Sequence, residues 1–339
     1  MMTALLRVQD LKKYFPVGKD LLGRPTQVVQ AVDGVSFTVE KGRTLGIVGE
    51  SGCGKSTTAR LLMHLIEPDE GRISIRGKEF GNISGRHPVA ELRRQMQMVF
   101  QDSYASLNPR LTIEDSIAFG PQIHGVSERE ARQQARELLE KVGLNPNIFV
   151  RRYPHELSGG QRQRVNIARA LAIKPEIVLL DEAVSALDKS VQAQVLNLLS
   201  DLKKEFGLTY LFISHDLNVV QYISDDVMVM YLGQVVESGP VEQLYQNPAH
   251  PYTRALLSSV PSQTPSERKQ HKVLEGDPPN PIAPPSGCRF HPRCEHARAI
   301  CSSQQPETKK VEGLHQAACF MLPANPSHEK YIQLQEVSA

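Results

Sequence analysis

The segment at residues 49–56 constrains this chain more than any other, because its sequence GESGCGKS fits the pattern G-x-x-x-x-G-K-[ST]. Glycines let the backbone curl so that successive N–H groups point inward at a phosphate, and a helix that follows adds the positive end of its dipole. The run RTLGIVGE ahead of the motif predicts a strand, and the residues after it predict a helix that stops at Pro68. This is the context in which the pattern forms a nucleotide phosphate-binding loop.

Each part of this loop has an expected role. Lys55 would reach the β- and γ-phosphates of ATP, and the hydroxyl of Ser56 would bind Mg²⁺. Cys53 is interpreted as a small residue that fills the turn and not as a redox centre. The residues of the loop that are predicted to bind ATP are Gly49, Glu50, Ser51, Gly52, Cys53, Gly54, Lys55, Ser56 and Thr57.

Composition and charge argue against several classes of protein. The chain has 339 residues, of which 40% are hydrophobic and 22% charged, as is usual for a globular domain. Its net charge is +2 and its basic residues are scattered, so nucleic acid is not expected as a partner. The sequence lacks both a run of about 18–20 apolar residues that could span a bilayer and a secretory signal at its N-terminus. We therefore expect a cytoplasmic protein that reaches a membrane only through a partner.

Short strands and helices alternate along most of the chain, which predicts an α/β fold. In the middle of the chain, the segments SEREARQQARELLEKVG and GGQRQRVNIARALAI have helical periodicity, and strand signals are few. We predict one domain over residues 1–260 with a helical subdomain over about 102–172, a Pro-rich linker over 261–285, a small Cys-rich region over 286–322 and a tail over 323–339.

The apolar strand IVLLDE ends in two carboxylates, Asp181 and Glu182. Taken alone, this pattern indicates an ordinary solvated strand end. Because it follows a phosphate-binding loop, we expect Asp181 to help hold Mg²⁺ and Glu182 to polarise a water for attack on the γ-phosphate. His215 ends a later strand and is a candidate sensor of the γ-phosphate, although a lone histidine in such a place is more often structural.

The segment LSGGQ places a serine and two glycines at the start of a helix, which makes a second helix end suited to an anion. It resembles the signature sequence of ABC ATPases, and its place between the loop and the acidic strand matches that family. The resemblance covers about residues 5–245 and implies a P-loop NTPase fold with a helical subdomain and an antiparallel β-subdomain. It also implies that this helix end faces a γ-phosphate held by another nucleotide-binding domain. The signature residues are Leu157, Ser158, Gly159, Gly160 and Gln161.

The same resemblance implies roles for further residues. Gln101 matches the Q-loop, which in the family contacts Mg²⁺ beside Ser56 and Asp181 and transmits movement to the membrane subunits. Phe15 matches the aromatic residue that stacks on adenine, with Tyr14 as the adjacent alternative. The D-loop is matched by Ser185, Ala186, Leu187 and Asp188.

One position departs from the family pattern. The family usually has proline directly after the catalytic glutamate, whereas this chain has Ala183 followed by Val184. The loss of proline frees φ at one position. Because Asp181 and Glu182 remain, and because His215 matches the switch histidine of the family, we expect ATP hydrolysis to be retained.

Further segments resemble the oligopeptide and dipeptide importer branch of the ABC family; they are YFP, FQD, SLNPR, HPYT and the Cys-containing HPRC. The resemblance implies a peripheral ATPase subunit on the cytoplasmic face of the cell membrane. Its implied partners are two transmembrane permease subunits, a second ABC ATPase that is either a sister subunit or another copy, and indirectly an external substrate-binding protein. Transporters of nickel, glutathione and antimicrobial peptides share these features, so the cargo stays open. A soluble ABC ATPase unrelated to transport is the less favoured alternative.

The C-terminal cysteines, Cys288, Cys294, Cys301 and Cys319, are not spaced as in a zinc finger, because they include no C-x₂-C pair. Stable disulfides are disfavoured in a cytosolic chain, and a metal would help so small a region to fold. Four thiolates can hold a [4Fe–4S] cluster without a fixed spacing, and the resemblance to peptide importers implies the same group. Zinc and four unliganded thiols are the alternatives. Any cluster is expected to be structural.

Overall fold

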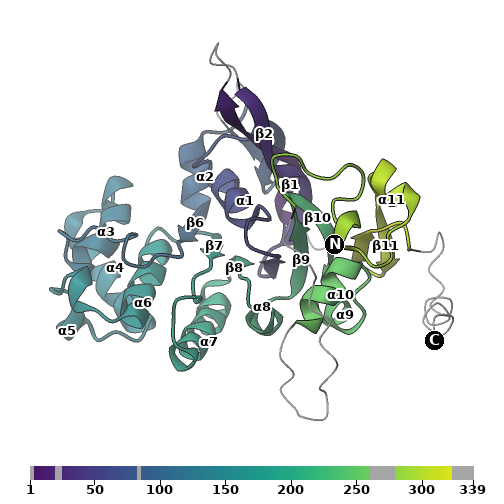
Figure 1. Ribbon diagram of the computed structural model, residues 1–339. Coiled ribbons are helices and arrows are strands. Elements are labelled where there is room, and N and C mark those ends of the chain that lie inside the picture. The colour runs from purple at the N-terminus through teal and green to yellow at the C-terminus, as the bar shows by residue number, and fades with distance from the viewer. Residues whose placement is uncertain (1–3, 20–24, 82–84, 260–278, 323–339) are drawn as a thin grey trace, which may run out of the picture.

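The computed structural model describes residues 4–19, 25–81, 85–259 and 279–322. These residues form two β-sheets and a separate group of helices, with the helical group at one end of the molecule and the C-terminal strands at the other (Figure 1). The predicted α/β class is confirmed.

Within the described residues, the larger sheet has eight strands in the order β11-β12-β10-β9-β3-β8-β7-β6. Strands β9, β3, β8, β7 and β6 run parallel to one another. Helices and the second sheet cover both faces, which explains why these strands are nearly continuous apolar runs. The parallel strands are β3 (Thr44–Val48), β6 (Met96–Val99), β7 (Ile177–Asp181), β8 (Thr209–Ile213) and β9 (Asp226–Tyr231).

The second sheet is antiparallel, in the order β2-β1-β4-β5, as the antiparallel β-subdomain of the predicted fold requires. Its strands are β1 (Ala4–Lys19), β2 (Pro25–Glu40), β4 (Glu70–Ile75) and β5 (Lys78–Phe80). Helix α1 (Lys55–Leu62) shares one hydrophobic core with both sheets, to which Leu6, Ile47 and Leu61 belong. The phosphate-binding loop therefore starts from the middle of the molecule.

The predicted helical subdomain consists of α3 (Ile113–Ile123), α4 (Glu128–Lys141), the short α5 (Pro146–Phe149) and α6 (Gly159–Leu171). Polar side chains start these helices: Thr112, Ser127, Asn145 and Ser158 each accept a hydrogen bond from a backbone N–H of the first turn. Apolar residues at helical spacing pack the group together. It forms the end of the molecule beyond β6 and β7 (Figure 1).

The remaining elements complete the sheet and lead to the C-terminal region. Strand β10 (Gln234–Pro240) runs antiparallel to β9 and pairs with β12 (His315–Ala318), which in turn pairs with β11 (Thr308–Glu312). The Cys-rich region therefore extends the central sheet at its edge. The helices not yet named are α2 (Val89–Gln95), α7 (Lys189–Phe206), α8 (Leu217–Ile223), α9 (Val241–Gln246), α10 (Pro251–Ser258) and α11 (Ala299–Ser303).

Most of the predicted linker (residues 261–278 of 261–285) and all of the predicted tail (323–339) lie outside the described residues. In the part of the chain that the structure describes, no helix is both long enough and apolar enough to cross a bilayer.

Candidate nucleotide site

The phosphate-binding loop turns from β3 into α1 through backbone conformations that favour glycine. Gly49, Gly52 and Gly54 have φ values of 153°, 79° and 107°. A Cβ atom on Gly49 would lie 2.2 Å from the carbonyl oxygen of Met230, and one on Gly54 would lie 2.3 Å from that of Ala31. Close packing as well as conformation therefore requires Gly49 and Gly54, whereas conformation alone favours Gly52.

Lys55 is buried at the start of α1, and its ammonium group folds back onto the loop. Its Nζ donates to the carbonyl oxygens of Gly49 at 2.7 Å and Glu50 at 2.9 Å. Cys53 is buried beneath the loop, and burial raises the pKa of its thiol. The position of Cys53 agrees with a small residue that fills the turn. The loop thus holds a cation at its centre, where the sequence predicts contact with phosphate.

Ser56 and Asp181, two of the predicted magnesium ligands, meet although 125 positions separate them in the sequence. The Ser56 hydroxyl donates to Oδ1 of Asp181 at 3.2 Å. Asp181 ends β7 in a buried position, and burial raises the pKa of its carboxyl group. A hydroxyl and a carboxylate are oxygen donors of the kind that Mg²⁺ prefers, so these two residues fit the predicted ion.

Glu182, Gln101 and His215 converge at the same edge of the sheet, where β7, β6 and β8 end. Gln101 Nε2 donates to Oε2 of Glu182 at 3.0 Å, and Nδ1 of His215 lies 3.3 Å from Oε1. Glu182 itself has a φ of 47°, a left-handed conformation that costs a non-glycine residue about 1–3 kcal/mol. The structure thus gathers the residues that the sequence assigned to hydrolysis, with Gln101 contacting Glu182.

The signature segment forms the start of α6, as predicted. Ser158 and Gln161 make a reciprocal pair: the Gln161 backbone N–H donates to Ser158 Oγ at 3.3 Å, and the Ser158 N–H donates to Gln161 Oε1 at 3.0 Å. A Cβ atom on Gly160 would lie 2.5 Å from Cγ1 of Val191, because α6 and α7 approach closely there. Leu157 is buried just before the helix.

The predicted D-loop connects Glu182 to α7. The Ser185 hydroxyl donates to the carbonyl oxygen of Glu182 at 2.9 Å, and Asp188 is the residue before the first turn of α7. The loop therefore joins the acidic strand end to a long helix.

Tyr14 and Phe15 lie on β1, where they pair with Gln30 and Val29 of β2 in the antiparallel sheet. The Tyr14 hydroxyl donates to Asp33 at 2.5 Å, and burial followed by this contact raises the pKa of Tyr14 to about 12. Phe15 is half-buried, with the ammonium of Lys13 at 5.7 Å from its ring centre. The hydroxyl of Tyr14 is thus engaged with β2, and Phe15 stays the predicted partner of adenine.

Sequence reasoning missed contacts that the C-terminal part makes with the loop. The Glu50 backbone N–H donates to the Tyr252 hydroxyl at 2.9 Å, and the Glu50 carboxylate pairs with Arg293 at 2.8 Å. Both contacts face α10 and the C-terminal region. Tyr252 lies in the motif HPYT and Arg293 in the motif HPRC. These two motifs were the sequence features from which a role for both residues could have been suspected.

All four C-terminal cysteines line one small pocket of about 20 Å³, together with His250 and Phe290 among others. Burial raises the pKa of the Cys288, Cys294 and Cys319 thiols, in the last case to about 11. In the described part of the chain, however, no group of three or more His, Cys, Asp or Glu side chains is arranged to hold a metal ion. The predicted iron–sulfur cluster is therefore not confirmed.

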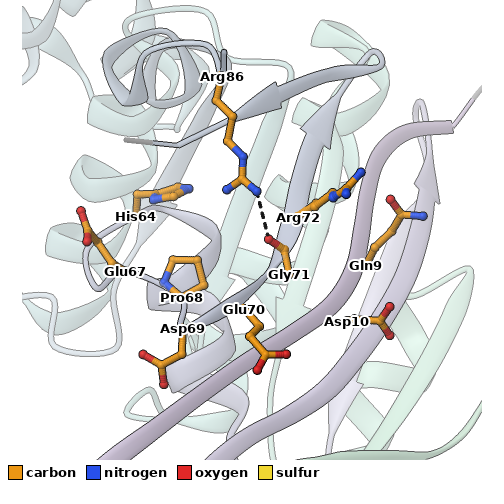
Figure 2. A pocket seen from close by; sticks show the side chains of 10 residues that line it. All are labelled: Gln9, Asp10, His64, Glu67, Pro68, Asp69, Glu70, Gly71, Arg72 and Arg86. Atoms are coloured by element: carbon orange, nitrogen blue, oxygen red, sulfur yellow. Dashed lines mark hydrogen bonds between the residues drawn. The ribbon is translucent and has the colours of Figure 1, made fainter. Parts of the chain in front are cut away.

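Figure 2 shows a larger pocket of about 530 Å³ beside the antiparallel sheet. Acidic and basic side chains line it, and Arg86 reaches across to the carbonyl oxygen of Gly71 at 3.5 Å. His64 is buried at its wall, and burial lowers the pKa of this imidazole. None of the residues predicted to bind nucleotide lines this pocket.

Comparison with known proteins agrees with this geometry. Residues 32–185 match the model of the ABC transporter family, and residues 236–301 match the model of the oligopeptide/dipeptide transporter C-terminal region. The oligopeptide transport ATP-binding protein AppF of Bacillus subtilis is 52% identical over 320 residues, which is 94% of this chain and 97% of that protein. The chain belongs to the oligopeptide/dipeptide branch of the ABC transporter ATP-binding proteins.

Other relatives of this ATP-binding protein agree. The dipeptide transport ATP-binding protein DppF of Haemophilus influenzae is 50% identical, over 94% of this chain and 97% of that protein. Among solved structures, cbiO1 of Clostridium perfringens, part of an ABC transporter complex, has a TM-score of 0.61 and 27% identity over 72% of this chain and 91% of that one. The dimeric post-hydrolysis structure of an ATP-binding cassette with ADP and phosphate has a TM-score of 0.59 and 28% identity, over 70% and 98%. The protein is thus an ATPase of the ABC family that uses ATP and Mg²⁺.

Proposed function

We propose that this ATPase energises the uptake of dipeptides and oligopeptides across the cytoplasmic membrane, as a peripheral subunit on its cytoplasmic face. The observation that carries the ATPase part is the convergence of Gln101, Glu182 and His215 beside Ser56 and Asp181. The names of the relatives support the peptide cargo, because those proteins are called oligopeptide and dipeptide transport proteins. Nickel, glutathione and antimicrobial peptides remain the alternative cargoes.

In the proposed mechanism, Lys55 and the loop glycines bind the phosphates. Ser56 and Asp181 would hold Mg²⁺, which would neutralise charge on the phosphates. Glu182 accepts a proton from the attacking water, whose oxygen bonds to the γ-phosphorus as the bond to ADP breaks. Gln101 and His215 orient the Glu182 carboxylate for this step. His215 lies beside it and would contact the γ-phosphate.

The other half of the site would come from a second ATPase, either a sister subunit or another copy of this chain. The start of α6 has backbone N–H groups and the positive end of a helix dipole, which suits it to a facing γ-phosphate. Hydrolysis would then separate the two ATPases. Ser158, which caps the start of α6, supports this role.

The proposed membrane partners are two permease subunits, and a substrate-binding protein acts through them. Large apolar side chains on the Q-loop segment and on α3 are exposed to 37–65% of their full area; they are Phe100, Tyr104, Phe119 and Ile123. Exposed apolar side chains of this kind are suited to a protein partner. Phe100 directly precedes Gln101, which contacts the Glu182 carboxylate. Movement at this surface would therefore change the position of Glu182.

A strain that lacks this gene tests the cargo. We expect it to lose growth on dipeptides or oligopeptides as the sole source of a required amino acid, and to recover when the wild-type chain is supplied. Growth on peptides that stays normal, with loss of nickel or glutathione uptake, would refute the peptide assignment. Co-purification with two polytopic membrane proteins separates a transporter subunit from a soluble ABC ATPase.

We also propose that Cys288, Cys294, Cys301 and Cys319 hold a structural [4Fe–4S] cluster, with zinc as the alternative. The support is that all four thiols line one pocket, and thiolates are the usual ligands of such clusters. Protein purified without oxygen would be brown and contain iron and acid-labile sulfide. Colourless protein with neither iron nor zinc would show four unliganded thiols.

The domain boundaries stay part of the proposal. We propose an ATPase domain over residues 1–260, a linker over 261–285 and a Cys-rich region over 286–322. The pairing of β12 with β10 supports a region that is attached to the ATPase domain and does not move as an independent body. Limited proteolysis between residues 260 and 285, with both fragments staying associated, would support these boundaries.

A further inference from the structure

Glu50, the second residue of the phosphate-binding loop, is held from outside the ATPase core. Arg293 Nη1 and Nη2 donate to the two carboxylate oxygens of Glu50 at 2.8 and 3.1 Å. The Arg293 side chain is only 7% exposed and that of Glu50 23%. A paired, two-point contact of this kind has a fixed geometry and is much less screened than a surface ion pair.

The contact is reinforced at the backbone. Tyr252 on α10 accepts a hydrogen bond from the Glu50 N–H at 2.9 Å. Phe290 packs against Tyr231 and Tyr252, with ring centres at 5.3 and 5.4 Å. The loop therefore rests on an aromatic cluster to which the C-terminal region contributes a buried ring.

A second arginine reaches the other side of the nucleotide site. Arg289 is buried, and its guanidinium pairs with Asp33 and contacts the carbonyl oxygen of Leu232. Asp33 also accepts the hydroxyl of Tyr14, beside the predicted adenine-stacking residue Phe15. One short stretch of chain thus contacts both the phosphate side and the adenine side of the site.

Both arginines lie between two cysteines, in the sequence CRFHPRC at residues 288–294, here called the bridge segment. Its turns are tight: the His291 N–H donates to the Cys288 carbonyl at 2.9 Å, and the Arg293 N–H donates to that of Phe290 at 3.0 Å. The cysteines at its two ends line the cysteine pocket. The segment that carries Arg289 and Arg293 is thus flanked at both ends by cysteines of this pocket.

We propose that the bridge segment is a positioning element of the nucleotide site, which couples the state of the cysteine pocket to the affinity for ATP through Arg293 and Glu50. Arg293 acts through Glu50: it fixes the start of the loop whose later N–H groups bind phosphate. The inference rests on the proposed nucleotide site, and it holds for any occupant of the cysteine pocket.

The test measures ATP binding and steady-state hydrolysis of the full-length chain. Arg293→Ala should raise the Kd for ATP at least fivefold, with kcat at saturating ATP within twofold of wild type, because chemistry at Glu182 is untouched. Arg293→Lys keeps the charge but loses the two-point contact, so its Kd should lie between the two. Glu50→Gln should raise Kd similarly, and the double variant should be no worse than either single change.

The link to the cysteines is tested by Cys294→Ser, which should raise the Kd for ATP in the wild-type background and have less than a twofold effect in the Arg293→Ala background. Lys309→Ala, an exposed change on β11 of the same region, is the matched control and should bind ATP normally. If Arg293→Ala is unfolded by circular dichroism, Arg293→Lys and Glu50→Gln decide the question.

A wild-type Kd for ATP in folded Arg293→Ala, or fully additive effects of Arg293→Ala with Glu50→Gln or with Cys294→Ser, would overturn the inference. Lys55→Ala separates this failure from that of the nucleotide site itself. If Lys55→Ala also binds ATP normally, the proposed site is wrong; if it loses binding while Arg293→Ala does not, only the positioning role fails.

Discussion

The carboxylate of Glu182 is held between the amide of Gln101 and the imidazole of His215, on a backbone in a left-handed conformation. We expect Glu182→Gln to bind ATP but to hydrolyse it about 10²–10⁴-fold more slowly, because an amide cannot accept the proton of the attacking water. Phosphate release and binding of a fluorescent ATP analogue measure the two effects. Glu140→Gln, an exposed change on α4, is the control. Hydrolysis at the normal rate would show that another group is the base.

A second residue-scale prediction concerns His64, the buried histidine of Figure 2. Burial, with Arg86 and Arg93 nearby, lowers the pKa of His64 from its ordinary value of 6.5. As the pH falls through 6.5, His64 becomes protonated in the unfolded chain but stays neutral in the folded chain. The free energy of unfolding therefore decreases. The decrease stops once the pH passes the lowered pKa of the folded state.

Replacing His64 by Asn should remove this part of the pH dependence, by at most about 1.4 kcal/mol per pH unit. Asparagine suits the position because the φ of His64 is 47°, and Asn tolerates left-handed conformations. Urea unfolding at several pH values between 7 and 5 measures the difference. An unchanged slope in the variant would show that other groups cause the dependence.

At the scale of elements, the start of α6 combines a cap with a proposed binding site. Ser158→Ala should lower the free energy of unfolding by about 1 kcal/mol, because the Gln161 N–H loses its acceptor. It should also weaken ATP hydrolysis by the assembled ATPase pair, because the serine hydroxyl would contact the γ-phosphate. Chemical denaturation and ATPase rates measure the two effects.

The chain contains a closely matched control for this change. Ser127 caps α4 with the same geometry, with its Oγ accepting the Glu130 N–H at 3.3 Å. Ser127→Ala should cost similar stability and leave hydrolysis intact. If both variants lose hydrolysis equally, the effect of Ser158→Ala is one of stability alone.

The sequence was sufficient for the elements whose signals are local. The loop at residues 49–56, the strand that ends at Asp181 and the helix after Ser158 all have patterns set by a few neighbouring residues, and the structure has each of them. The contacts of Arg289 with Asp33 and of Arg293 with Glu50 were not foreseen, because they join residues 256 and 243 positions apart and depend on how β12 docks against β10. Such pairings follow from tertiary packing, for which a single sequence gives no periodic signal.

On the scale of the whole molecule, the C-terminal region supplies His315 to a buried cluster of hydrogen-bonded polar groups around Glu237. Glu237 is fully buried and accepts N–H groups of Ala249 and His250, and His315 Nε2 lies 2.7 Å from its Oε1. Deleting residues 286–339 should lower the free energy of unfolding by at least about 3 kcal/mol. The buried carboxylate of Glu237 then loses His315, and β10 loses its neighbouring strand β12. Urea unfolding of the truncated chain measures this effect.

Within the truncated chain, Glu237→Gln should recover part of the stability, because the amide needs no opposing charge. In the full-length chain the same change should be destabilising, since His315 then loses its carboxylate partner. A truncated chain as stable as the full-length one would show that the C-terminal strands add nothing to the sheet.

The strand β12 lies beside β10 although the paired residues Glu237 and Ala317 are 80 positions apart in the chain. During synthesis, the sheet therefore gains its final two strands only after the segment that connects β10 to β12 has been made. Until then, β10 is an open edge and the loop lacks Arg293. A nascent chain of this protein should consequently acquire full affinity for nucleotide only after β12 has paired with β10.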